Sequence, residues 1–257
     1  MYTRTHIILS TLFLSLSPIS LQMQYNTIMA DNINAHQYAD KKVKAQKAAQ
    51  DKIVKDGKLI EDTWSHVKKK EGKGKKGKDY IAYWDKVWNK KEQKHYYYRT
   101  VGHGINLDAP HNEKYMKTLV SPEQYQAIYD GEMPVSEALD EQMVRYNIKL
   151  GLDFAQRTID NFDSMPYDVQ ALSTDMYYNM GNVPKKMPNF FKALNQKDYH
   201  QASLELKYHD PSKDKEKTTG YYDQTGGRSK EHFSTLSKYP RIEKVKERNE
   251  LIFHFED

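Results

Sequence analysis

Residues 80–107, YIAYWDKVWNKKEQKHYYYRTVGHGINL, carry the pattern that decides the fold. Over residues 80–85, Tyr80, Ala82 and Trp84 alternate with Ile81, Tyr83 and Asp85, which is the period of two expected of a strand. Residues 96–101 are rich in the aromatic and β-branched types that favour strands. The polar residues 89–93 between these runs are typical of a hairpin turn. We therefore predict a small antiparallel sheet over residues 80–107, too short to be a domain by itself.

Helical periodicity dominates on both sides of this sheet. Before it, Leu59, Ile60, Trp64 and Val67 fall near helical spacing and stop at Glu71-Gly72, where glycine favours a helix end. After Pro134 a long helix is predicted from a stripe that consists of Leu139, Met143, Tyr146, Leu150 and Phe154. Further helices are expected after Pro166 and up to Gly181, over 190–194, over 199–206, around Phe233 and Leu236, and over 242–255. These elements predict an α+β fold, with a small hairpin lobe over about 71–120 and an all-helical lobe over about 134–257, joined by the long helix.

Charge and composition narrow the class of protein. The chain has 257 residues, no cysteine and a formal net charge of +5, which excludes disulfides, thiolate metal sites and a cysteine nucleophile. Residues 41–99 hold 19 basic and 8 acidic side chains, so the remainder carries about −6. A basic N-terminal half suits a polyanion such as nucleic acid, an acidic membrane or an anionic cell wall.

The N-terminal residues are typical of an export signal. Arg4 and His6 precede an apolar run over residues 7–21, which Pro18 and serines interrupt. We expect residues 1–30 to be a signal peptide cleaved near Ala30, which implies a secreted or periplasmic protein without stable membrane insertion after cleavage. A buried N-terminal helix and a retained membrane anchor are the alternatives. Residues 31–55 are expected to form a polar and basic linker or a solvated helix, and residues 56–257 the main domain.

Two carboxylates and a hydroxyl are predicted to meet where the lobes join. Glu71 ends a helix, while Asp85 and Thr100 are expected at the ends of the first and second strands. A pair of carboxyl groups across a cleft is the minimal equipment for cleaving a glycosidic bond, since one protonates the leaving oxygen and the other activates water. The hydroxyl of Thr100 is placed to hold that water. With 35 acidic residues in the chain, most such pairs are surface charge.

The order of short motifs resembles the phage-type lysozyme family. The motifs are Glu71-Gly72, Tyr83-Trp84-Asp85, Thr100-Val101-Gly102-His103-Gly104, Val135-Ser136-Glu137-Ala138, Asn179-Met180-Gly181, and Tyr221-Tyr222-Asp223-Gln224-Thr225 followed by Arg228. Each is short, so the specificity lies in their order, which covers residues 61–236.

This resemblance implies a lysozyme-like fold and a muramidase that cleaves between N-acetylmuramic acid and N-acetylglucosamine with inversion. It implies that Glu71 is the general acid and that Asp85 and Thr100 position the attacking water. The substrate-binding residues it implies are Gly102, Gly104, Asn179, Gln224 and Arg228, of which Arg228 would orient the acid. Peptidoglycan is the expected partner, the protein is expected to be a monomer, and no cofactor, metal or nucleic acid is expected.

Three departures from the family pattern leave alternatives open. Glu71 and Asp85 are farther apart than is usual, as are Asp85 and Thr100, so Asp79 or Glu92 could instead supply the second carboxylate. The histidine that often ends the glycine motif is replaced by Ile105-Asn106, and His103 lies inside the motif. His95, His103 and His111 are spaced by eight and lack a paired carboxylate pattern, which argues against a zinc site there.

The lysines near Glu71 in sequence disfavour a protonated acid, unless they project into solvent, where screening limits their effect. They are Lys68, Lys69, Lys70, Lys73, Lys75 and Lys76. Other functions remain open as well. A lysozyme-like module that holds peptidoglycan without cutting it would have the same fold. A secreted basic nucleic-acid binder would bind in a salt-dependent way, but the chain lacks a recognisable nucleic-acid motif. A lytic transglycosylase needs no carboxylate that activates water, so the pair of Asp85 and Thr100 argues against this alternative.

Overall fold

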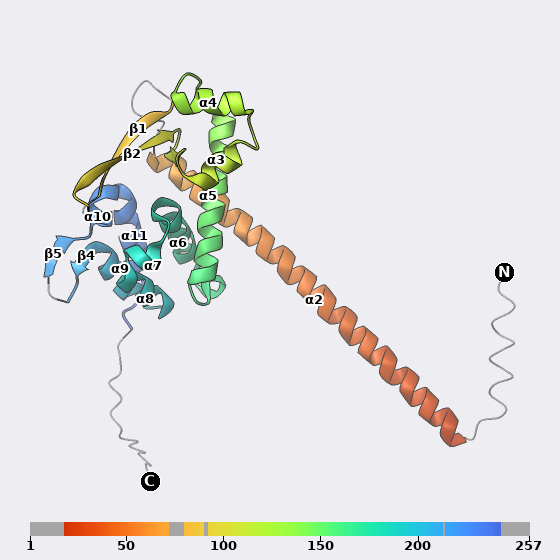
Figure 1. Cartoon of the computed structure of the whole chain (residues 1–257). Coiled ribbons are helices and arrows are strands. Elements are labelled where there is room, and N and C mark those ends of the chain that lie inside the picture. Colours follow the sequence, from red (N-terminus) through yellow and green to blue (C-terminus); the bar gives the residue numbers. More distant parts are fainter. Residues whose placement is uncertain (1–17, 72–79, 90–91, 213, 243–257) are drawn as a thin grey trace, which may run out of the picture. The chain divides into compact units, whose positions relative to one another are not determined.

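The computed structural model describes residues 18–71, 80–89, 92–212 and 214–242 (Figure 1). The chain divides into two compact units, Met1–Lys55 and Asp56–Asp257. Helix α2 (Pro18–Glu71) supplies the described part of the first unit and runs on into the second. Residues 31–55, which the sequence leaves as linker or helix, are therefore helical, and residues 40–54 are exposed. No helix in the described ranges is long and apolar enough to cross a bilayer.

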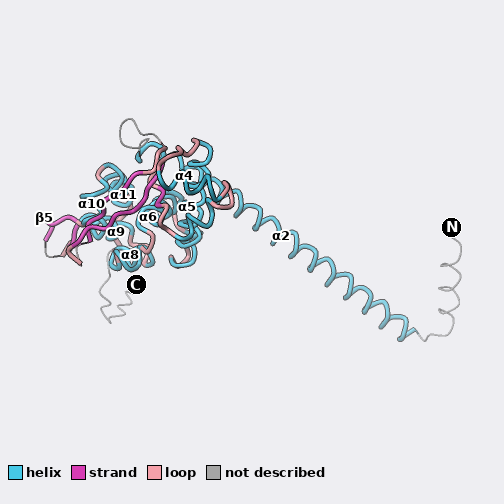
Figure 2. The backbone as a smooth tube through the Cα atoms, turned by 45° about the horizontal axis from the view of Figure 1, so that its top comes forward, coloured by secondary structure: helices cyan, strands magenta, loops and turns pink. Residues whose placement is uncertain are grey.

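The second unit mixes helices with a small antiparallel sheet of three strands, visible in Figure 2. The strands are β1 (Tyr83–Asn89), β2 (Lys94–Val101) and β3 (Ile105–Asn106), in the order β1-β2-β3. The hairpin turn lies where the polar residues predict it, between Asn89 and Lys94. The prediction that Asp85 ends the first strand is wrong. Asp85 is the third residue of β1, because the strand-favouring Val87 and Trp88 extend the pairing as far as Asn89.

Two short helices that the sequence analysis did not predict follow the sheet, α3 (Pro110–Met116) and α4 (Pro122–Asp130). Proline at the start of each is compatible with a first helical turn, which needs no amide donor there. Ser121 and Gln124 form a capping box at the start of α4, and Gly131 ends it in the left-handed conformation, with φ of 80°. Both helices pack on the sheet side of the unit, where Met116 and Ile128 are fully buried.

Helix α5 (Glu137–Thr158) joins two hydrophobic cores. Its first half contributes Met143 and Ile148 to the core beside the sheet, and its second half contributes Leu152 and Ala155 to the core of the helical lobe. Helix α2 does the same, since Leu59 packs in the helical core and Trp64 and Val67 in the sheet core. The buried face of α5 does not coincide with the predicted apolar stripe, because four residues of that stripe are only half-buried: Leu139, Tyr146, Leu150 and Phe154.

The remaining elements form the helical lobe. After the short 3-10 helix η1 (Phe162–Ser164) they are α6 (Tyr167–Met180), α7 (Val183–Lys186), α8 (Pro188–Asn195), α9 (Tyr199–Lys207), the hairpin β4 (Tyr208–Asp210) and β5 (Asp214–Thr218), α10 (Gly220–Thr225) and α11 (Gly227–Ser237). The predicted helices after Pro166, over 190–194, over 199–206 and around Phe233 are confirmed. Most of the predicted helix over 242–255 lies outside the described residues. The small hairpin β4–β5 was not predicted.

Candidate active-site cleft

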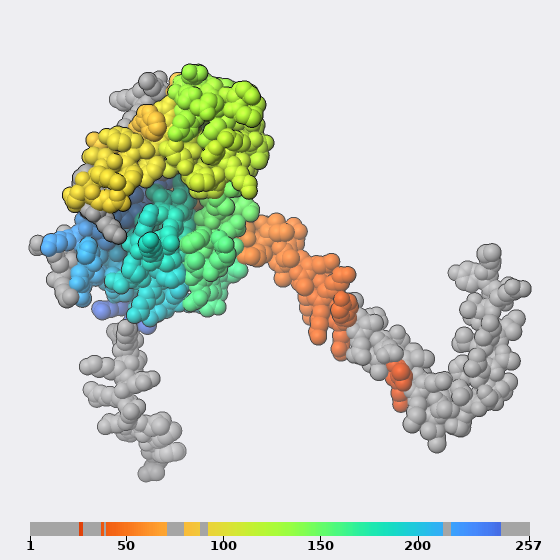
Figure 3. All heavy atoms as spheres, in the orientation of Figure 1, coloured from red at the N-terminus to blue at the C-terminus, as the bar shows by residue number. Residues whose placement is uncertain are grey.

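A cleft of about 660 Å³ separates one face of the β1–β2 hairpin from the end of α6. The hairpin contributes Tyr83, Asp85 and Val87 from β1 and Tyr98 and Thr100 from β2. Side chains two apart on a strand share a face, and the register pairs Tyr83 with Thr100 and Asp85 with Tyr98. The opposite wall is formed by Tyr178, Asn179, Met180, Gly181 and Lys186. Figure 3 shows the hollow between the sheet, in yellow, and the helices below it.

Asp85 and Thr100 therefore both line this cleft. The carboxylate of Asp85 is half-buried, and its Oδ1 accepts a hydrogen bond from the amide of Lys86 at 2.9 Å. Thr100 is only 5 % exposed and lies next to the end of β2. On neighbouring strands, diagonal positions such as these are roughly 7–8 Å apart, a separation that leaves room for a water between short side chains.

Glu71 is the last residue of α2, as predicted, but its side chain lies outside the described residues. Two of the lysines near Glu71 in the sequence form ion pairs with glutamates of other helices. Lys68 pairs with Glu137 at the start of α5, and Lys70 pairs with Glu231 of α11. The Lys70 ammonium holds the pKa of the Glu231 carboxyl below its ordinary value. The positive charge that could oppose a protonated Glu71 is thus partly balanced, whereas Lys73, Lys75 and Lys76 lie outside the described residues.

The two glycines of the motif after Thr100 have different surroundings. Gly104 is exposed and lines the cleft. Gly102 is buried with φ of +55°, and a Cβ built on it would lie 1.8 Å from Asp140 Oδ1. That carboxylate accepts hydrogen bonds from the His103 amide at 2.9 Å and lies 2.5 Å from His103 Nδ1. Gly102 therefore makes room for a buried His103–Asp140 pair, which the sequence analysis missed because the partners are 37 positions apart.

A second cavity of about 760 Å³ adjoins the cleft and shares Val87, Asn179, Met180 and Lys186 with it. It extends along α10, where Gln224 lines it. The two cavities form one extended groove, so the predicted substrate-binding residues Gly104, Asn179 and Gln224 lie along a continuous surface. Tyr178, another residue of this wall, donates a hydrogen bond to the carbonyl of His103 at 3.1 Å and so ties α6 to the glycine motif.

Arg228 does not line either cavity. It lies in the first turn of α11, is 5 % exposed, and its Nε is 3.2 Å from Asp175 Oδ2 on α6. Asp175, which the sequence pattern does not single out, is thus one partner of Arg228. The described residues place Arg228 in a buried network of helices α2, α6 and α11, not in the groove.

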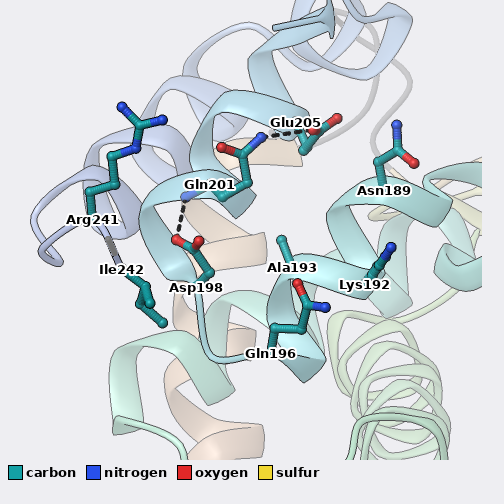
Figure 4. A pocket seen from close by; sticks show the side chains of 9 residues that line it. All are labelled: Asn189, Lys192, Ala193, Gln196, Asp198, Gln201, Glu205, Arg241 and Ile242. Carbon is teal, nitrogen blue, oxygen red and sulfur yellow. Dashed lines mark hydrogen bonds between the residues drawn. The ribbon is translucent and has the colours of Figure 1, made fainter. Parts of the chain in front are cut away.

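Another hollow, of about 740 Å³, lies between α8 and α9 and is lined by polar side chains such as Asn189, Lys192 and Gln196 (Figure 4). Its two carboxylates already have structural roles. Asp198 caps α9 by accepting from the amide of Gln201, and Glu205 accepts from the Gln201 side chain at 2.8 Å. Both acids are thus occupied in helix α9, and the groove beside the sheet is the candidate site.

The three histidines that are spaced by eight in the sequence have different surroundings. His95 is exposed on β2, His103 pairs with Asp140, and His111 lies 3.3 Å from Asn147 Oδ1 through its Nε2. His66 and His232, which were not considered, approach Asp175 from two other helices. Comparison with known proteins adds no assignment, since no family model and no curated protein matches the chain.

Proposed function

We propose that the chain is a peptidoglycan hydrolase of the lysozyme-like kind, an N-acetylmuramidase that cleaves the β-1,4 bond between N-acetylmuramic acid and N-acetylglucosamine with inversion. One observation carries the proposal: Asp85 and Thr100 share the face of the hairpin that lines the cleft, opposite Asn179. A carboxylate beside a hydroxyl in a partly enclosed groove is suited to hold and deprotonate a water.

We assign the role of general acid to Glu71. It ends a helix whose preceding turns, through Trp64 and Val67, are buried against the core of the sheet. In an inverting hydrolysis the acid protonates the leaving oxygen while the base takes a proton from water on the opposite face of the sugar. The two carboxyl groups then stand roughly 6.5–9.5 Å apart. In this proposal Glu71 is the acid and Asp85 the base, with Thr100 orienting the water.

The shape of the site suits a polymer. The cleft and the cavity beside α10 adjoin, so the groove has room for several consecutive sugars rather than one small molecule. Amide groups of Asn179 and Gln224 can hydrogen-bond N-acetyl and hydroxyl groups. The ring of Tyr98 lies on the cleft face, where it can stack on a sugar.

Architecture and charge support the same proposal. Two cores joined by the long helix α5 are the organisation that the resemblance to phage-type lysozymes implies. The excess of basic residues over 41–99 favours an anionic cell wall, to which binding should weaken as salt rises. We accordingly propose an exported monomer whose partner is peptidoglycan, and hydrolysis by two carboxylates needs no cofactor.

Product analysis on purified peptidoglycan tests the proposal. Digestion should release muropeptides that end in reducing N-acetylmuramic acid, identified by mass spectrometry after borohydride reduction. Products that end in 1,6-anhydro-N-acetylmuramic acid would identify a lytic transglycosylase instead. Binding to peptidoglycan without any soluble product would identify a silent binding module, and either result would refute the hydrolase.

A further inference from the structure

Two histidines and an aspartate from three helices converge in the helical lobe, outside the groove. His66 comes from α2, Asp175 from α6 and His232 from α11. One nitrogen of each imidazole and a carboxylate oxygen all lie within 4.8 Å of one another. Asp175 Oδ2 is 3.0 Å from His232 Nε2 and 3.8 Å from His66 Nε2. From this cluster we infer a binding site for a divalent first-row transition ion, of which Zn²⁺ is the best match.

The donor types fit such an ion. Two neutral imidazoles and one carboxylate are a common ligand set for zinc, with a fourth position left for water. Ligands about 2.0–2.1 Å from a tetrahedral ion stand roughly 3.3 Å from one another. The separations of 3.0 and 3.8 Å from Asp175 Oδ2 to the two imidazole nitrogens bracket that value. The ligand atoms all lie within 4.8 Å of one another, so side-chain rotations can bring them to bonding distance.

Two buried polar atoms of these ligand residues lack hydrogen-bond partners among the described residues. His66 Nε2 and Asp175 Oδ1 are both shielded from solvent, and neither has a hydrogen-bond partner among the described residues. Leaving buried polar atoms without a partner costs free energy, which an ion would recover.

The outer nitrogen of each histidine faces a group that can orient it. His66 Nδ1 lies 3.6 Å from Glu231 Oε2, and His232 Nδ1 lies 3.0 Å from the hydroxyl of Tyr221. Metal-binding histidines generally donate their second N–H to such a carboxylate or oxygen, which fixes the tautomer. Both Nε2 atoms then face Asp175 and the space between the helices.

An ion also has a route to the cluster. A cavity of about 220 Å³ is lined by all three ligand residues together with Asp62, Asp168 and Glu231. Asp62 pairs with Lys58 and Glu231 with Lys70, whereas Asp168 accepts a hydrogen bond from the neutral Tyr239 hydroxyl and can attract a cation toward the opening. Arg228 lies 3.2 Å from the same oxygen, Asp175 Oδ2, so an ion there would meet a positive charge that opposes it. We therefore expect moderate affinity, with the ion tying α2, α6 and α11 together.

The test uses the full chain without a histidine tag. Isothermal titration with Zn²⁺ should give one site per chain, and a hundredfold excess over the dissociation constant should raise Tm by about 5–10 °C. Co²⁺ should give the visible absorption of a tetrahedral complex. Mg²⁺, which prefers oxygen ligands, should change neither signal.

Two variants separate this site from incidental binding. His66→Gln should weaken Zn²⁺ binding by at least about tenfold and remove the Co²⁺ absorption. Because His66 is partly exposed, this variant should fold, which its Tm without metal will check. His95→Gln, which removes an exposed histidine from the sheet, should bind as the unsubstituted chain does.

The inference is wrong if the unsubstituted chain binds no Zn²⁺, if His66→Gln binds as tightly, or if Mg²⁺ stabilises as much as Zn²⁺. These readouts do not depend on peptidoglycan cleavage, so they stand apart from the proposed function.

Discussion

Asp85 and Thr100 occupy diagonal positions on one face of the β1–β2 hairpin, with Asp85 paired to Tyr98 and Thr100 paired to Tyr83. This relationship places a half-buried carboxylate and a buried hydroxyl together on the wall of the cleft. It also shows how the proposed catalytic pair shares one face of a long hairpin. Residues 86–99 extend the hairpin toward its tip, and pairing in register keeps both positions on the same face.

Replacing the proposed base should abolish most of the activity without unfolding the protein. We expect Asp85→Asn to lower kcat on peptidoglycan by about 100-fold or more, because the amide cannot take a proton from water. Glu92→Gln is the matched control, since Glu92 lies at the hairpin turn, where it accepts a hydrogen bond from Tyr96. Near-normal kcat in Asp85→Asn combined with a large loss in Glu92→Gln would reassign the base to Glu92.

Gly102 should tolerate no side chain. Gly102→Ala places a methyl group at φ of +55° and 1.8 Å from Asp140 Oδ1, so it displaces the His103–Asp140 pair. We expect a loss of at least about 2 kcal/mol in the free energy of unfolding, measured by urea denaturation.

Gly57→Ala is the control, because the same addition at this exposed position of α2 meets no atom within 4 Å. It should stabilise the protein by up to about 1 kcal/mol. Equal effects of the two substitutions would show that the space around Gly102 is not restricted.

Tyrosine burial should make the helical lobe sensitive to alkali. Burial raises the pKa of Tyr177 from 10.0 to about 12, although its hydrogen bond with Thr158 lowers it. A raised folded-state pKa means that this contribution to stability is complete below pH 10 and is lost as the pH rises toward 12. Tyr177→Phe should therefore lose less stability over that interval, by about 2–3 kcal/mol in urea denaturation. Parallel stability curves for the two proteins would contradict this.

Lys186 lines both cavities of the groove, and under the proposed function we expect it to contact the lactyl carboxylate of N-acetylmuramic acid. Lys186→Met should raise KM by up to about tenfold at low salt, with little change in kcat. The matched control is Lys192→Met, because Lys192 lines the separate hollow beside α9. An unchanged KM in Lys186→Met would remove this contact from the account.

Local patterns in the sequence predict much of this fold. The alternation around Tyr83 predicts the hairpin, and the helical spacing around Trp64 predicts the helix that ends at Glu71. Both elements can be predicted because their patterns involve residues close together in the sequence. The short helices α3 and α4 have weaker periodicity, although the Ser121–Gln124 capping box marks the start of α4. Proline at the start of both helices is a further local signal, because its fixed φ suits the first helical turn.

Long-range partners are less accessible to such patterns. The pair His103–Asp140 and the cluster around Asp175 join residues from separate elements, and nothing in the spacing of His66 and His232 predicts that they meet. Asp85 was predicted to end its strand, but the strand continues because Val87 and Trp88 pair with Tyr96 and His95. The placement of Asp85 in the cleft follows from this register, which the turn and the opposite strand determine together.

The most direct test of the account is the release of reducing ends from purified peptidoglycan by the unsubstituted chain and by Glu71→Gln. A glutamine keeps the shape of the side chain but cannot protonate the leaving oxygen. The account predicts that the unsubstituted chain releases reducing ends and that Glu71→Gln, with an unchanged Tm, does so at least about 100-fold more slowly. Equal rates for the two proteins, or no release by the unsubstituted chain, would contradict it.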